Sequence, residues 1–150
     1  MAVRVQREDF DVAVETAKLI AGNPDIGAIV TFTGRVRGKD DGRKITALTL
    51  EHYPDMTEAE MARIEADTLA RWPLQASLVI HRVGELMAGD NIVLVIAASE
   101  HRQAAFEAAG FLMDYLKTRA PFWKKETTAA GDSAWVEARE EDESAAGRWR

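Results

Sequence analysis

Three lysines near the end of the chain stand where an amine could do chemistry. In the stretch DYLKTRAPFWKKE (114–126), Lys117 precedes an aromatic pair, and Lys124 and Lys125 follow it. Apolar walls and neighbouring cations lower the pKa of an amine, which would make one of these lysines a general base or a nucleophile. The alternative needs no function: Lys117 would complement a helix C-terminus, and the other two would lie on the outer side of a strand.

Two arginines could hold an anion. Arg35 and Arg37 stand two residues apart in FTGRVR, on either side of Val36. On a β-strand this spacing puts both guanidiniums on one face, where an anion could bind between them. The alternative is a solvated hairpin end, where the two arginines need no ligand.

A second basic motif, SEHR, lies where an apolar run passes into a helical pattern. Ser99 is the expected N-cap of that helix, and His101 and Arg102 follow it. Cations at a helix N-terminus oppose the helix dipole unless an anion such as a phosphate binds there. An anion site and an unliganded helix end both remain open on this motif alone.

The composition excludes several classes of protein. The 150 residues include no cysteine, so disulfides, thiolate metal sites and persulfide chemistry on this chain are excluded. The net charge of −6 argues against nucleic-acid and anionic-membrane binding. His52 and His81 lack metal-ligand spacing and are expected to be ordinary strand histidines. No P-loop, G-x-G-x-x-G or G-x-S-x-G motif appears, and we expect a cytoplasmic protein without metal or cofactor.

The elements that must position these residues follow from periodicity and turn signals, and they form one α+β domain over residues 1–150. Helices are expected at 11–21, 57–72 and 99–120. The first should bury Val14, Ala17 and Ile20, and the second should begin with a Thr57/Glu60 capping box.

Strands are expected at 3–6, 27–37, 45–53, 76–84 and 91–99, with a last hairpin around Gly131-Asp132. Runs 27–37 and 45–53 should pair as an antiparallel hairpin turning at Asp41-Gly42. Residues 140–150 are expected to be a mobile or weakly docked tail.

Several motifs together resemble one known family. FTGRVR, LTLEHYPDMTE, IHRVGEL, SEHR, AFEAAGFLMDYLKTRAPFWKKE and WVEAR occur in order over roughly residues 27 to 140, and they are similar to the large, catalytic subunit of molybdopterin synthase. The resemblance implies an α/β-hammerhead fold with an additional antiparallel β part. It also implies a homodimer at the centre of a heterotetramer with two small ubiquitin-like subunits.

The resemblance implies a reaction as well, a sulfur transfer. The small subunit would insert a C-terminal Gly-Gly thiocarboxylate, and two sulfurs would pass to cyclic pyranopterin monophosphate to form the dithiolene of molybdopterin. By position, the resemblance makes Lys117 and Lys124 the active-site lysines. The substrate-binding positions that it implies are these two lysines and Arg35, Val36, Arg37, His101, Arg102, Lys125, Glu126 and Arg139.

An alternative function, from another class of protein, stays open. The chain could be a non-catalytic dimeric module that binds an anionic metabolite or a partner's C-terminal tail in the same basic pocket. His101 and Lys117 lie sixteen residues apart on one expected helix, which is about 24 Å. A pterin monophosphate cannot span this length. If both helix ends belong to one catalytic pocket, as the resemblance implies, one subunit of a dimer must supply Lys117 and the other His101 and Arg102.

Overall fold

The computed structural model describes residues 2–136 and 140–149. One of its two sheets has four strands, in the order β1 (Ala2–Gln6), β5 (Leu74–Arg82), β7 (Asn91–Ser99) and β2 (Ala28–Arg35). Strand β1 runs parallel to β5, and the other pairs are antiparallel. Strand β7 is internal and buried on both faces from Val93 onward, as its continuous apolar run predicts.

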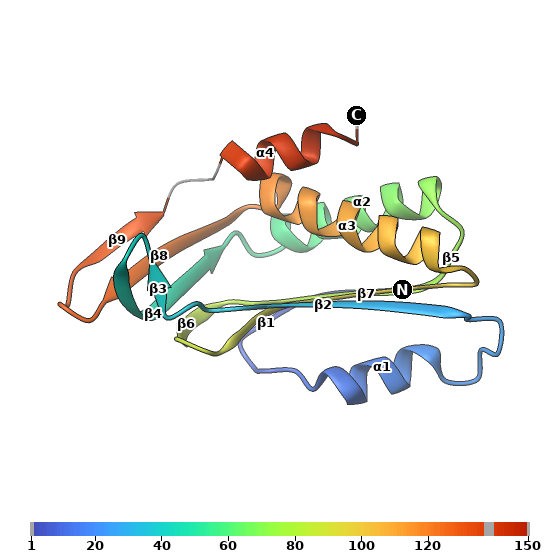
Figure 1. Cartoon of the computed structure of the whole chain (residues 1–150), viewed down its shortest axis with the longest axis horizontal. Helices are drawn as coiled ribbons and strands as arrows, with labels where there is room; N and C mark the ends of the chain where they lie inside the picture. Colours follow the sequence, from blue (N-terminus) through green and yellow to red (C-terminus); the bar gives the residue numbers. More distant parts are fainter. Residues whose placement is uncertain (1, 137–139, 150) are drawn as a thin grey trace.

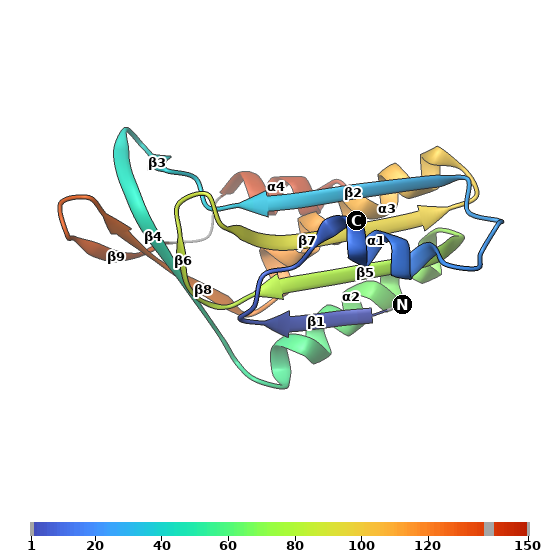
Figure 2. The ribbon, with the colours of Figure 1, turned by 90° about the horizontal axis from the view of Figure 1, so that it is seen from below.

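Helices cover both faces of this sheet (Figures 1 and 2). Helix α1 (Val12–Ile20) lies on one face, while α2 (Met56–Arg71) and α3 (Arg102–Arg119) lie on the other. Alternation along the strands divides the core accordingly. Leu78, Ile80, Leu94 and Ile96 point to the α1 side with Phe10, whereas Val79, Val93 and Val95 point to α2 and α3.

A second sheet is attached at one end of the first. It contains β3 (Lys39–Asp40), β4 (Arg43–His52), β8 (Phe122–Thr128) and β9 (Ser133–Val136), and β6 (Gly84–Met87) also pairs with β4. All of its pairings are antiparallel. The expected α+β class, a hammerhead-type fold with an added antiparallel part, is confirmed. The last hairpin is confirmed over the described residues, since β8 and β9 flank Gly131.

The predicted hairpin between 27–37 and 45–53 is wrong. Strand β2 pairs with β7, and β4 pairs with β3, β6 and β8. The turn at Asp41-Gly42 does form, but it joins β3 to β4. The chain leaves β2 at a bulge after Gly34, and Val36 then exchanges backbone hydrogen bonds with the 89–90 loop, at 2.7 and 2.8 Å. This switch from one sheet to the other prevents β2 from continuing into a hairpin with β4.

Two of the predicted helix starts lie elsewhere. Helix α2 begins with Asp55 as N-cap, and the carboxylate of Glu58 accepts from the Asp55 backbone N–H at 2.9 Å, so the box sits two residues before the predicted one. The N-cap of α3 is His101 and not Ser99. Ser99 stays in β7, where its hydroxyl donates to the carbonyl of Pro73 at 2.9 Å, and so it is not available as a cap.

The buried face of α1 also differs from the predicted one. Val14 is 46% exposed, while Val12 and Leu19 pack against the core. The helix bounds agree with the predicted 11–21 to within one residue, and Asp11 is the N-cap. The way in which α1 lies on the sheet decides which of its faces is buried. The nine residues of the helix have a mixed apolar and polar pattern, and this pattern does not determine the buried face. None of the helices among the described residues has the length and apolarity to cross a membrane.

Residues after 139 form a helix that the composition did not predict. Helix α4 (Glu140–Gly147) lies on α3 (Figure 1), and Ala146 is 1% exposed. Beyond it, Asp114 Oδ2 accepts from Trp149 Nε1 at 2.6 Å and from Arg148 Nη2 at 2.8 Å. The Trp149 ring meets Trp72 and Phe111 edge-on. These contacts dock the segment, and the expected mobility of residues 140–150 stays a prediction about dynamics.

We expect Trp149→Ala to lower the free energy of unfolding by about 2 kcal/mol, because it removes a half-buried indole and its hydrogen bond to Asp114. Urea unfolding followed by circular dichroism measures the change. The matched control is Phe106→Ala on α3, whose ring is 64% exposed and whose loss should change stability by less than about 0.5 kcal/mol. Equal stability of Trp149→Ala and the parent chain would show that the segment contributes no docking energy.

Candidate active site

A cavity of about 630 Å³ lies where the end of β2, strands β4 and β8 and the C-terminal half of α3 meet. Apolar groups such as Ile45, Leu48 and Met113 form part of its wall. Among the described residues, the charged side chains that line it are five cationic and three acidic ones, namely Arg35, Arg37, Lys39, Lys117 and Lys124 with Asp40, Glu126 and Asp142. The excess of cations makes the cavity suited to an anionic ligand.

Two consecutive elements bring the predicted lysines together. Helix α3 ends at Arg119, with Ala120 as C-cap and Pro121 after it, so Lys117 stands in the last turn. Strand β8 begins one residue after the proline. Lys124 lies opposite the buried Leu50 of β4 and so faces the cavity. Strand alternation therefore turns Lys124 to the cavity that Lys117 also lines.

Lys125 does not line the cavity. It pairs with Trp135 of β9 on the opposite face of the sheet, and its Nζ lies 5.7 Å from the centre of that indole ring. Glu126, the next residue, returns to the cavity face. Of the lysine pair in the motif, the structure thus brings only the first to the candidate site, and a substrate contact of Lys125 stays a prediction.

Arg35, Val36 and Arg37 all line the cavity, but not as a strand pair. Strand β2 ends at Arg35, and the buried Val36 turns the chain before Arg37. The guanidinium of Arg35 donates to the carbonyl of Gly89, from Nε at 3.1 Å and from Nη2 at 2.7 Å. The predicted strand therefore ends before Arg37, although both arginines line the same cavity.

His101 and Arg102 lie away from these residues. Both are exposed at the N-terminal end of α3, and neither lines the cavity. The helix runs unbroken from Arg102 to Arg119, so the rise of about 1.5 Å per residue separates its ends by more than 20 Å. Within one chain the two basic ends do not meet. Arg139 falls outside the described residues.

His81, predicted to be an ordinary strand histidine, lines the cavity. Its ring stacks on Phe122 with centroids 3.7 Å apart, and its Nδ1 lies 2.8 Å from the carbonyl oxygen of Arg82. The pKa of His81 is lowered from 6.5 to about 3, mainly by burial; the hydrogen bond to Arg82 opposes this shift, and the nearby charges of Lys124 and Lys117 add to it. The ring is therefore neutral at ordinary pH. Its place on the apolar face of β5, two residues after Val79, was a signal in the sequence.

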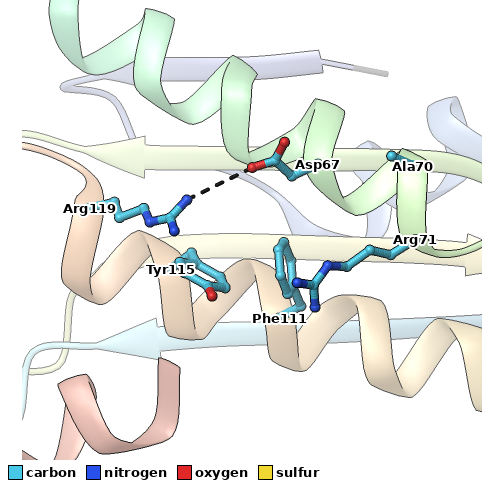
Figure 3. A pocket seen from close by; sticks show the side chains of 6 residues that line it. All are labelled: Asp67, Ala70, Arg71, Phe111, Tyr115 and Arg119. Carbon is cyan, nitrogen blue, oxygen red and sulfur yellow. Dashed lines mark ion pairs between the residues drawn. The ribbon is translucent and has the colours of Figure 1, made fainter. Parts of the chain in front are cut away.

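A second hollow, of about 300 Å³, lies between α2 and α3 (Figure 3). Its charged groups are engaged with one another and with rings. Arg119 Nη1 lies 3.8 Å from Asp67 Oδ2, and its guanidinium covers Tyr115 at 4.1 Å. Arg71 covers Phe111 at 4.6 Å. This hollow has half the volume of the cavity and fewer charged groups, so the cavity is the better candidate. Across the described residues, no cluster of three His, Cys, Asp or Glu side chains is arranged to hold a metal ion.

Fold and cavity together define an α+β protein with a basic, partly apolar cavity that brings two lysines together. Residues 5–119 match the family model described as MoaE protein. The chain belongs to this family. Over 149 residues it is 60% identical to the molybdopterin synthase catalytic subunit of Mesorhizobium japonicum, covering 99% of this chain and 92% of that one.

Solved structures give the same result. The molybdopterin biosynthesis MoaE protein of Burkholderia ambifaria is 48% identical, with a TM-score of 0.84, and the match covers 99% of this chain and 98% of that one. A chain from the complex of subunits 1 and 2 of the Helicobacter pylori molybdopterin-converting factor shares the fold, with a TM-score of 0.71 at 19% identity, over 92% and 90% of the two chains. The resemblance found in the sequence motifs is confirmed, and the chain is an enzyme subunit of molybdenum cofactor synthesis.

The neutral state of His81 predicts a pH dependence of stability. Its pKa is about 3 in the folded chain and 6.5 ordinarily. Between these values the unfolded chain binds a proton that the folded chain does not, so the contribution is fully present above pH 6.5 and is lost as the pH falls towards 3. Between pH 7 and pH 4, we expect His81→Gln to lose less stability than the parent chain, by at most about 3 kcal/mol.

Urea unfolding of both chains at the two pH values makes this comparison, and the shared titration of carboxylates cancels in it. The matched control is His101→Gln, which removes an exposed histidine and should leave the pH dependence of the parent chain unchanged. A His81→Gln chain with the same loss as the parent would mean that His81 titrates normally in the folded state.

Proposed function

We propose that the chain is the catalytic subunit of a sulfurtransferase. It passes two sulfurs from the thiocarboxylated C-terminus of a small ubiquitin-like partner to cyclic pyranopterin monophosphate, which forms the dithiolene of molybdopterin. One observation carries the proposal: Lys117 and Lys124 converge with Arg35 and Arg37 in a single cavity. Membership of the MoaE family supports it. We place the reaction in the cytoplasm.

The chemistry of the cavity suits both proposed reactants. Its cationic groups would bind a phosphate monoester and the C-terminal carboxyl group of the partner. An amine beside the reacting atoms could accept a proton as sulfur attacks carbon, and a cation could stabilise the negative charge that develops. The chain has no cysteine, so the sulfur has to arrive on another molecule.

The partner and the assembly follow from the same proposal. The Mesorhizobium relative is named a catalytic subunit, and the Helicobacter structure is a complex of two different subunits. We propose a homodimer of this chain with one small subunit bound at each cavity, whose extended Gly-Gly tail enters it. Incubation with the thiocarboxylated partner and the pterin precursor tests the proposal directly. Dithiolene formation supports it, whereas binding without turnover would indicate a non-catalytic module.

Lys117→Arg should fold and bind the partner but lose nearly all turnover, at least about 100-fold, if the amine of Lys117 transfers a proton. Arginine keeps the positive charge but does not give up a proton at neutral pH. Single-turnover formation of dithiolene measures the effect. The matched control is Lys18→Arg, which changes a lysine in the last turn of α1, away from the cavity. Turnover by Lys117→Arg at the parental rate would remove Lys117 as base or nucleophile.

We further propose that each active site is shared across the dimer, one chain supplying Lys117 and the other His101 and Arg102. The length of α3 supports this, because one substrate cannot reach both of its ends. Lys117→Ala and Arg102→Ala homodimers should each be severely impaired, since the single defect appears in both sites. In a mixed dimer one site collects both defects and the other collects neither, so about half of the parental activity should return.

Differently tagged chains, co-expressed and purified through both tags, give the mixed dimers. Dimers of two parental chains carrying the same tags are the control for full activity. If one chain built each site alone, both sites of the mixed dimer would stay defective, and activity no higher than that of the homodimeric variants would contradict the shared site.

A further inference from the structure

His81 is fixed in the wall of the cavity from three directions. Its backbone is held in β5 between Val5 of β1 and Val93 of β7. Its ring lies flat on Phe122, with an angle of 15° between the two planes. Its Nδ1 lies 2.8 Å from the Arg82 carbonyl oxygen. The side chain is 8% exposed, and the cavity is where it meets open space.

These contacts decide which ring nitrogen carries the hydrogen. A carbonyl oxygen only accepts, so Nδ1 must be the donor in the bond to Arg82. In a neutral imidazole the lone pair then sits on Nε2. The lowered pKa of His81 keeps the ring in this neutral form, and burial is the main cause. His81 therefore brings an uncharged hydrogen-bond acceptor to a cavity whose other titratable lining groups, among the described residues, are lysines, arginines and carboxylates.

We propose that His81 is a substrate-binding residue whose Nε2 accepts a hydrogen bond from an uncharged N–H group of the pterin. The inference rests on the proposed function, since it assigns a role toward that substrate. Lysines and arginines serve an anionic phosphate but cannot accept a hydrogen bond from a ring N–H. A carboxylate could accept one, but it would also pair with the neighbouring cations. A neutral acceptor on a rigid ring selects the heterocycle without competing for those charges.

His52 provides an internal control. It stacks on Phe122 from strand β4, with centroids 6.3 Å apart, and it does not line the cavity. Its Nδ1 is buried without a hydrogen-bond partner in the described part of the chain. The two histidines thus share a ring neighbour and a residue type, and they differ in access to the cavity. Replacing each by phenylalanine separates the effect of the acceptor from that of the stacked ring.

Steady-state kinetics with cyclic pyranopterin monophosphate and the thiocarboxylated partner test the inference. His81→Phe keeps a stacked ring but loses the acceptor, and it should raise the KM for the pterin by about ten-fold or more, with kcat within about three-fold of the parent. His81→Gln, whose amide oxygen can stand near the position of Nε2, should recover most of this loss. His81→Asn keeps only a group near Nδ1 and should behave like His81→Phe. His52→Phe should leave the KM unchanged.

Nitrogen NMR of the unmodified chain gives a second readout that no folding defect can affect. The three histidines are assigned from single variants, and the pterin is added without the small subunit, so that it binds without reacting. The Nε2 resonance of His81 should be that of an unprotonated nitrogen and should move on binding, while that of His52 should not. An unmoved His81 resonance, or a parental KM in His81→Phe, overturns the inference alone. A parental chain that neither binds nor converts the pterin overturns the proposed function as well.

Discussion

The close packing of α3 on β7 determines where the charged groups of the site can stand. Ala105 and Ala108 are fully buried, and their small side chains let the helix lie directly on the sheet. Because α3 is a continuous helix packed along the sheet, it cannot bend to bring its two ends together. Its C-terminal turn delivers Lys117 to the cavity, and its N-terminal turn carries His101 and Arg102 to the other end of the sheet. The division of the basic residues into two groups is thus a result of packing.

The cavity also has to hold like charges near one another. Of the described residues, five cationic side chains line it, together with three acidic groups and several apolar side chains. Arg35 donates two hydrogen bonds to the Gly89 carbonyl, which fixes its guanidinium without neutralising it. A site of this kind is preorganised for an anion. Its charged groups therefore need little rearrangement when the anion binds. The stack of Phe122 on His81 holds the first residue of β8, and with it the strand that carries Lys124.

Features governed by neighbouring residues could be predicted from the sequence, and features governed by distant ones could not. Pro73 and Pro121 mark the ends of α2 and α3, and Asp41-Gly42 marks a turn, because each acts on its own backbone. The partner of β2 could not be predicted, since alternation says which face is buried but not which strand lies beside it. Helix α4 escaped prediction because its docking depends on Ala146 and Trp149 meeting residues of α3 more than thirty positions earlier.

The same distinction applies to the residues of the candidate site: some could be predicted from the sequence, and others could not. Lys117, Lys124 and the arginines stand out by charge and spacing, and the cavity contains them. Lys125 shares the motif but faces away, because neighbours on a strand point to opposite sides. His81 was judged by its lack of metal-ligand spacing, whereas its role depends on a ring from β8, forty-one residues later. A buried strand histidine has no sequence signature beyond being polar on an apolar face.

The register of β8 gives the second sheet an unusual sensitivity to changes in length. Leu50 faces Lys124 across the ladder, and Leu48 faces Glu126. One residue inserted into or deleted from β8 ahead of Lys124 would turn Trp123 or Lys125 towards the cavity and send Lys124 and Glu126 to the outer face. A change of two residues would restore the facing while shifting the side chains along the strand. Natural variation in chain length should therefore collect in the loop after Thr128, where the number of residues can change without reversing the two faces of the strand.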